Sequence, residues 1–133
     1  MNRREYLQSL AALPLATVQA QPQQTGQKPA IQLHLDLEVE PSLEGEMVAN
    51  FRKTFRPAIR RQPGFLDVRL LKLRSAVAGK PPANSTYRLL ISFESEEQRQ
   101  TWVATDTHQK VWPTIEKCLR GAKYTALLYD VTS

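Results

Sequence analysis

The sequence predicts an α+β domain built from four strands and two helices in the order β-α-β-β-α-β. Three observations carry this prediction. Residues 31–39 alternate between apolar and polar side chains, residues 44–62 carry an apolar stripe with a spacing of four, and Ser95 opens a capping box with Gln98. A period of two indicates a strand, whereas a spacing of four and a capping box indicate helices.

The first strand and the first helix have the clearest patterns. Ile31, Leu33, Leu35, Leu37 and Val39 share one face of the expected strand. Met47, Phe51, Phe55 and Ile59 then form the helical stripe, which Pro63-Gly64 ends. Pro57 lies inside this helix and is expected to kink it, because proline lacks a backbone N–H.

The second and third strands are expected over residues 65–74 and 86–94, joined by a long turn rich in Pro and Gly. The alternation slips at Leu70-Leu71, which indicates a bulge or burial of both faces. The second helix is expected from Ser95 to about Val111, with Pro113 starting a further turn through Leu119. The last strand is expected over residues 124–131.

This element order is that of the ferredoxin-like βαββαβ plait. Two helices can cover only one face of such a sheet, so the other face is left to solvent or to a second chain. That second face carries apolar residues, including Leu90, among charged ones. We therefore expect a homodimer.

Residues 1–20 have the pattern of an export signal and resemble the twin-arginine type, with Arg3-Arg4 followed by Tyr6-Leu7. An ordinary secretory signal with a basic start is the alternative. Residues 21–30, rich in Gln and Pro, are expected to form a flexible spacer before a domain at 31–133. The expected location is therefore periplasmic or secreted. The apolar run is interrupted by Pro14 and is too short for a stable membrane anchor.

Composition excludes several classes of function. The chain of 133 residues has a formal net charge of +5, with scattered basic residues and no basic face with interleaved aromatics, so no nucleic-acid partner is expected. Cys118 is the single cysteine and is expected to be a small core residue, and no Cys/His cluster has zinc spacing, so no metal site is expected. No glycine-rich phosphate loop is present.

Two stretches go beyond a generic plait. Residues 55–65 read Phe-Arg-Pro-Ala-Ile-Arg-Arg-Gln-Pro-Gly-Phe, and residues 93–112 run from Phe-Glu-Ser through Trp102 and His108 to Trp112. With the element order, they resemble the antibiotic biosynthesis monooxygenase (ABM) domain of the dimeric α/β-barrel superfamily. The stress-responsive A/B-barrel family shares this fold and is a close rival.

The resemblance implies a homodimer whose sheets face each other in a barrel, and a pocket between helices and sheet. It also implies oxidation of aromatic substrates without metal or flavin, or haem degradation. Trp102 matches a tryptophan that often lines the pocket. The haem-degrading branch has an iron-binding histidine ten residues later, and here that position is Trp112. No cofactor is therefore expected, although haem and flavin stay open.

The candidate catalytic residues are Trp102, Asp106 and His108. Asp106 lies one turn after Trp102 and would present a base beside its ring, whereas His108 would lie about 240° around the same helix. The alternatives are a core tryptophan, a solvated aspartate and a surface or interface histidine. The candidate substrate-binding residues are Trp112, Phe51, Phe55 and His34. Trp112 is expected to pack at the helix break, and His34 could couple with Asp36 if their face lines the barrel, although an exposed strand face explains them as well.

The sequence therefore predicts an exported monooxygenase-like enzyme that oxidises a small aromatic or quinone-like molecule. The alternative is a non-catalytic barrel that binds a small ligand. Polar groups that converge around Trp102 would favour the enzyme, and a purely apolar or collapsed space would favour the alternative.

Overall fold

The computed structural model describes residues 29–133, which form one sheet covered on one face by helices. The predicted export signal and almost all of the predicted spacer lie outside the described residues, so both stay predictions. In chain order the elements are β1 (Ile31–Val39), η2 (Pro41–Leu43), α2 (Glu44–Asn50), η3 (Phe51–Phe55), α3 (Arg56–Ile59), β2 (Phe65–Lys72), β3 (Tyr87–Phe93), α4 (Glu96–Val103), α5 (Asp106–Glu116) and β4 (Leu119–Asp130).

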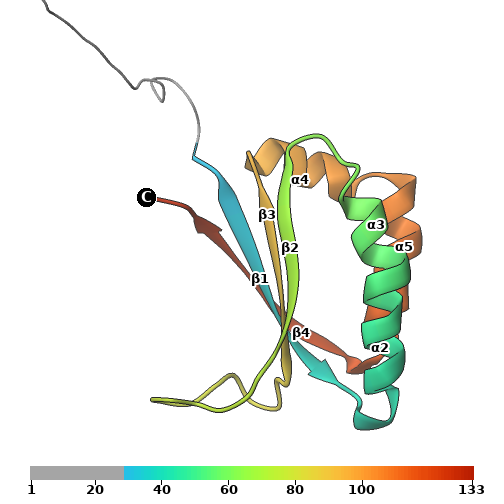
Figure 1. The fold of residues 1–133 in the computed structure, drawn as a ribbon, viewed down its shortest axis with the longest axis vertical. Helices are drawn as coiled ribbons and strands as arrows, with labels where there is room; N and C mark the ends of the chain where they lie inside the picture. The colour runs from blue at the N-terminus through green and yellow to red at the C-terminus, as the bar shows by residue number, and fades with distance from the viewer. Residues whose placement is uncertain (1–28) are drawn as a thin grey trace, which may run out of the picture.

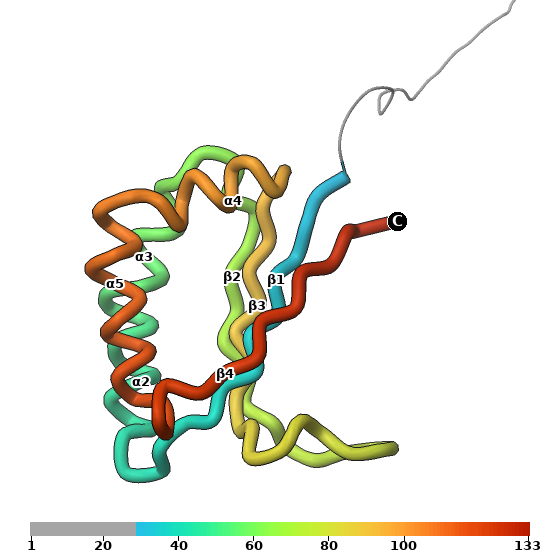
Figure 2. Tube along the Cα trace, turned by 180° about the vertical axis from the view of Figure 1, so that it is seen from behind, coloured from blue at the N-terminus to red at the C-terminus, as the bar shows by residue number. Residues whose placement is uncertain are grey.

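The four strands form an antiparallel sheet in the order β2-β3-β1-β4. Figures 1 and 2 show all the helices on one side of this sheet, while the connection from β2 to β3 projects toward the other side. The predicted α+β, ferredoxin-like fold is therefore confirmed. No helix within residues 29–133 is long and apolar enough to cross a membrane.

The core lies between the sheet and the helices. Leu37, Leu89 and Phe93 point from the sheet into it, and the helices contribute mainly bulky side chains. The fully buried helical residues are Met47, Phe55, Ile59 and Ile115, with Trp102 almost fully buried. Cys118 is buried between α5 and β4, as expected of a small core residue, although it follows the helix instead of lying in it.

A π-helical turn precedes Pro57 and accommodates it. The N–H of Arg56 donates to the carbonyl of Phe51, five residues back. Because of this wider turn, α3 begins immediately before Pro57. A backbone N–H in the first turn of a helix has no intrahelical acceptor, so a proline there removes no helical hydrogen bond. Phe51 and Phe55, at the two ends of the turn, both stay buried.

The second helix breaks earlier than predicted. It ends at Val103, and Thr105 caps a new helix by accepting the N–H of His108 at 3.0 Å. Pro113 lies inside α5 and does not restart it. Pro113 is exposed, so the backbone carbonyl that receives no hydrogen bond from the proline can accept one from water instead. The predicted cap at Ser95 is confirmed, with the N–H of Gln98 donating to the Ser95 hydroxyl at 3.2 Å.

Two strand details also differ from the prediction. The irregularity in β2 falls between Phe65 and Asp67, and not at Leu70-Leu71. The last strand begins at Leu119, and its register with β1 shifts where Gly121 and Ala122 adopt positive φ angles of 60° and 55°. The left-handed backbone at these two residues interrupts the alternation of apolar and polar side chains, so the sequence pattern did not reveal where the strand begins.

Candidate functional site

A pocket of about 380 Å³ lies between the sheet and the helices. The strands contribute mostly aliphatic side chains to it, and the helices contribute aromatic and polar ones. The lining residues are Leu33, Leu35, Ile91, Tyr124, Ala126 and Leu128 from the strands, with Phe55, Arg99, Trp102, Val103, His108 and Trp112 from the helices. This is the position that the family resemblance implies.

Four aromatic rings pack edge to face along this pocket. The ring of Phe55 lies 6.0 Å from that of Trp102 and 6.4 Å from that of Trp112. Trp112 in turn lies 5.3 Å from the ring of Tyr124 on β4. Edge-to-face contacts fix ring orientation, so these side chains give the pocket a rigid aromatic wall.

His108 lies against Trp102, and the expected separation of 240° around one helix is wrong. Because the chain turns at Ala104 and Thr105, the start of α5 returns to the end of α4. The two rings stand 5.0 Å apart at 85°. Within residues 29–133, Nδ1 of His108 is the one buried side-chain nitrogen or oxygen that has no hydrogen-bond partner.

Arg99 places a positive charge beside this histidine. Its guanidinium binds the Glu96 carboxylate through two hydrogen bonds of 2.7 and 2.6 Å. Burial lowers the pKa of His108 below its ordinary value of 6.5, and the charge of Arg99 lowers it further. The site therefore combines a neutral imidazole with a cation in an aromatic pocket.

The expected pairing of Trp102 with Asp106 is wrong. Asp106 belongs to the first turn of α5, beyond the helix break, and its side chain is exposed. An acidic residue there is favoured by the helix dipole, which explains it without a role in the pocket.

The candidate substrate-binding residues divide between three places. Phe55 and Trp112 line the pocket, and Trp112 packs within α5 and not at a helix break. Phe51 stacks behind Phe55 at 6.2 Å and does not line the pocket. His34 lies on the opposite face of the sheet, where its ring stacks on Tyr129 at 4.7 Å.

His34 and Asp36 do not form the acid–base couple that their spacing allowed. The Asp36 carboxylate is 4% exposed and accepts from Nε of Arg88 at 2.8 Å. His34 instead bonds to Gln32 at 3.1 Å. Burial lowers the pKa of His34, the charge of Arg88 lowers it further, and Asp36 opposes both effects.

Sequence reasoning missed Arg99 and Tyr124 as pocket residues. Arg99 precedes Trp102 by three positions, a spacing that places both on one side of a helix and could have indicated it. Tyr124 begins the regular part of β4, and nothing local distinguishes it from an exposed strand residue.

The described residues offer few ligands for a metal ion or a haem iron. Among residues 29–133, no group of three or more His, Cys, Asp or Glu side chains could hold a metal ion. At the position of the haem-branch histidine, the ring of Trp112 packs against Phe55 and Tyr124 and offers no iron ligand. His108 is the one histidine among the residues that line the pocket. The position that binds iron in the haem-degrading branch therefore offers no ligand in this chain.

No family model matches the chain, and no curated protein matches it. Several solved structures share its fold. A candidate antibiotic biosynthesis monooxygenase from Caulobacter crescentus CB15 has a TM-score of 0.63 and 18% identity, covering 80% of this chain and 92% of its own. SnoaB, a cofactor-independent oxygenase from Streptomyces nogalater, has a TM-score of 0.58 and 14% identity, covering 81% and 96%.

Two further solved structures share the fold. A dimeric ferredoxin-like protein of unknown function from Jannaschia sp. CCS1 has a TM-score of 0.66 and 14% identity, covering 77% of this chain and 99% of its own. A heme-degrading protein from Mycobacterium tuberculosis has a TM-score of 0.56 and 21% identity, covering 80% and 94%. The chain therefore has the ferredoxin-like fold of antibiotic biosynthesis monooxygenase-type proteins, as its sequence predicted.

Proposed function

We propose that this protein is a monooxygenase-like enzyme that oxidises a small aromatic hydroxyl compound, such as a phenol with a free para position, without metal or flavin. One observation carries the proposal: His108, with its buried and unpartnered Nδ1, stands edge to face with Trp102 in an aromatic pocket beside Arg99. Polar groups thus converge around Trp102, which favours an enzyme over a passive binding protein.

The pocket residues can hold the substrate, remove its hydroxyl proton and stabilise the resulting anion. The aromatic wall holds a planar ring, and the neutral His108 accepts the proton of its hydroxyl group through Nε2. The buried Nδ1–H can then use the indole face of Trp102 as a weak acceptor. Arg99, the one cation that lines the pocket, stabilises the resulting oxyanion while its guanidinium stays paired with Glu96.

The electrons come from the substrate, so the reaction balances without a reductant. A phenol with a free para position reacts with one O₂ to give a quinone and one water. One oxygen atom becomes the new carbonyl and the other leaves as water. Ionising the hydroxyl is the protein's contribution, since an electron-rich phenolate reacts with oxygen more readily than a phenol.

The comparisons support this proposal at a coarse level. SnoaB, which shares the fold, is a cofactor-independent oxygenase, and the Caulobacter protein is a candidate antibiotic biosynthesis monooxygenase. Haem degradation, the activity of the M. tuberculosis protein, is not proposed, because Trp112 stands where the haem-degrading branch has its iron-binding histidine.

The protein is also proposed to be a homodimer that associates through the uncovered face of its sheet. Leu71, Leu127 and Tyr129 lie on that face with 42–45% of their surface exposed. Exposed apolar side chains on an uncovered sheet face favour an interface. The Jannaschia protein with the same fold is dimeric. Sedimentation equilibrium should give twice the chain mass, and a monomer at all concentrations would contradict the proposal.

Oxygen uptake tests the enzymatic proposal. The purified full chain is mixed with 1-naphthol or another phenol that has a free para position, in an oxygen-electrode cell without added metal or cofactor. We expect uptake above the spontaneous rate, a loss of about 10²-fold or more in His108→Gln, and unchanged uptake in Asp106→Asn. Equal uptake by wild type and His108→Gln across the panel would overturn the proposal, and saturable binding without uptake would indicate a binding protein.

A further inference from the structure

We infer that the ligand of this pocket carries an apolar extension, such as an alkyl chain, which leaves the pocket along β4. This inference rests on the proposed use of the pocket, and it adds the second half of the ligand. The surface concerned is the β4 shelf, defined as Leu33 on β1 with Tyr124, Ala126 and Leu128 on β4.

The β4 shelf is apolar and faces the same side of the sheet as the helices. In the pairing of β4 with β1, Leu128 lies opposite Leu33, Ala126 opposite Leu35, and Tyr124 opposite Leu37. Leu33 and Leu35 line the pocket, so this row of β4 side chains points to the pocket side. None of the four shelf residues is charged.

The helices leave this part of the sheet uncovered. Leu128 is 45% exposed and Tyr124 is 40% exposed, although both lie on the face that elsewhere forms the core. In Figures 1 and 2 the upper part of β4 extends away from the helices, while its first residues lie next to α5. The shelf therefore continues the aromatic part of the pocket onto an open apolar surface.

Side-chain size gives the shelf its shape. Ala126, the smallest lining residue, lies between the larger side chains of Tyr124 and Leu128 on the same row. Four residues of a strand span about 13 Å. A narrow apolar group can lie along this row, while a hydroxyl-bearing ring at the inner end meets His108 and Arg99.

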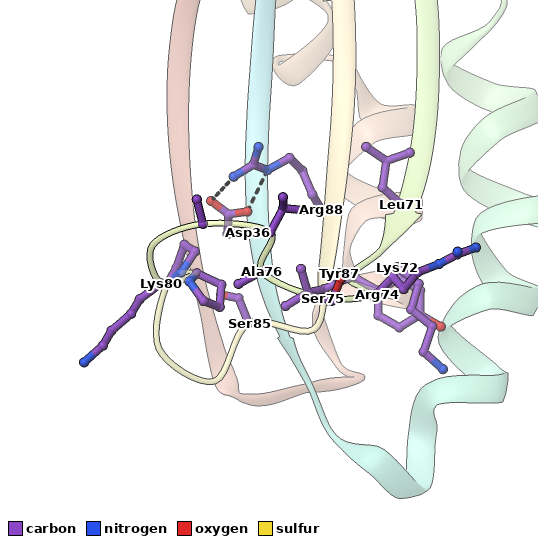
Figure 3. Close-up of a pocket in the computed structure, with 15 residues that line it drawn as sticks. Asp36, Leu71, Lys72, Arg74, Ser75, Ala76, Lys80, Ser85, Tyr87 and Arg88 are labelled. Atoms are coloured by element: carbon purple, nitrogen blue, oxygen red, sulfur yellow. Dashed lines mark hydrogen bonds and ion pairs between the residues drawn. The ribbon is translucent and has the colours of Figure 1, made fainter.

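The other cavities fit this ligand less well. The groove of Figure 3, about 500 Å³ between the β2–β3 loop and the uncovered face, is bordered by Lys72, Lys80 and the Asp36–Arg88 ion pair. It lies on the opposite face of the sheet from Trp102. An apolar chain attached to a ring beside Trp102 can follow the β4 shelf without crossing the sheet.

The test is an affinity series of 3-alkylphenols, from 3-methylphenol to 3-octylphenol, which keep the para position free, measured by calorimetry without oxygen. Complete burial of a methylene contributes about 0.8 kcal/mol, which is about a fourfold gain in affinity. On a half-open shelf we expect about a twofold gain for each added carbon. Leu128→Ser should at least halve the slope of the logarithm of affinity against the number of alkyl carbons. Ala126→Leu, which fills the centre of the row, should also reduce this slope.

Leu127 supplies the matched control. It neighbours Leu128, has the same 45% exposure, and points to the opposite face. Leu127→Ser should keep the wild-type slope. A flat wild-type series, or equal slopes in the Leu127 and Leu128 variants, would overturn the inference. Because binding is measured without oxygen, the two proposals can fail separately. A wild-type slope in the affinity series, together with no oxygen uptake in the separate activity assay, would contradict the proposed enzyme but not the proposed use of the β4 shelf.

Discussion

At the level of single residues, the proposed chemistry depends on His108 staying neutral at physiological pH. Burial lowers the pKa of His108 and the charge of Arg99 lowers it further, so the midpoint at which the protonated imidazole loses its proton lies below pH 6.5. The neutral imidazole is then available as a base near pH 7. The buried, unpartnered Nδ1 carries a cost that a purely structural role would not explain.

This electrostatic arrangement predicts a specific pH dependence. The value of kcat/KM should rise with pH as His108 loses its proton, and the midpoint of this rise should lie below pH 6.5. Arg99→Gln removes the second cause of the lowered pKa, so the midpoint should move upward while the maximal rate falls. Rates measured from pH 4.5 to 8 check this, and a midpoint above 6.5 in wild type would contradict a neutral base.

At the level of elements, the break between α4 and α5 positions the site. Thr105 caps α5 through the N–H of His108 and also donates to the carbonyl of Trp102 at 2.7 Å. One side chain therefore ties together the two segments that carry the ring and the base. Without this break, His108 would point away from the pocket.

Thr105→Ala tests the importance of that tie. Loss of the cap should lower the free energy of unfolding by about 1 kcal/mol. It should also reduce oxygen uptake, because His108 is no longer held against Trp102. Thr105→Ser keeps both hydrogen bonds and serves as the control in urea unfolding and rate measurements. If Thr105→Ala behaves like Thr105→Ser in both, the break does not position the site.

The same elements show what the sequence could predict. Strict alternation in β1 and the cap at Ser95 were sufficient to place those elements, because local chemistry and tertiary packing agree there. The breaks were not predictable from proline alone. Pro57 is accommodated by a π-helical turn and Pro113 by an exposed helical position, whereas Thr105, an unremarkable polar residue in sequence, ends the run.

The site was predictable only in part for the same reason. Trp102 lines a pocket between helices and sheet, where the family resemblance puts it, and Phe55 and Trp112 line the same pocket, while their roles toward a substrate stay predictions. The pairing with Asp106 failed because it assumed one continuous helix. His108 and Arg99 meet at the pocket through a tertiary turn that no periodicity records.

At the level of the whole molecule, the two faces of the sheet divide the proposed roles. The helix-covered face holds the aromatic pocket and the β4 shelf, and the uncovered face carries Leu127, Tyr129 and the Asp36–Arg88 pair. Every residue that we assign to ligand binding comes from one chain. Self-association through the uncovered face would thus leave the pocket chemistry in each copy complete.

The central claim is that this pocket binds an aromatic hydroxyl compound and ionises it. The chain has two tryptophans, Trp102 and Trp112, and both line the pocket, so tryptophan fluorescence reports on that pocket. The most direct measurement is an anaerobic titration with 4-nitrophenol, followed by fluorescence and by the absorbance of the phenolate. We predict saturable quenching, with the bound probe ionised at a lower pH than the free probe and this shift lost in His108→Gln and Arg99→Gln. Quenching that never saturates, or a bound probe that ionises at the same pH as in solution, would contradict the account.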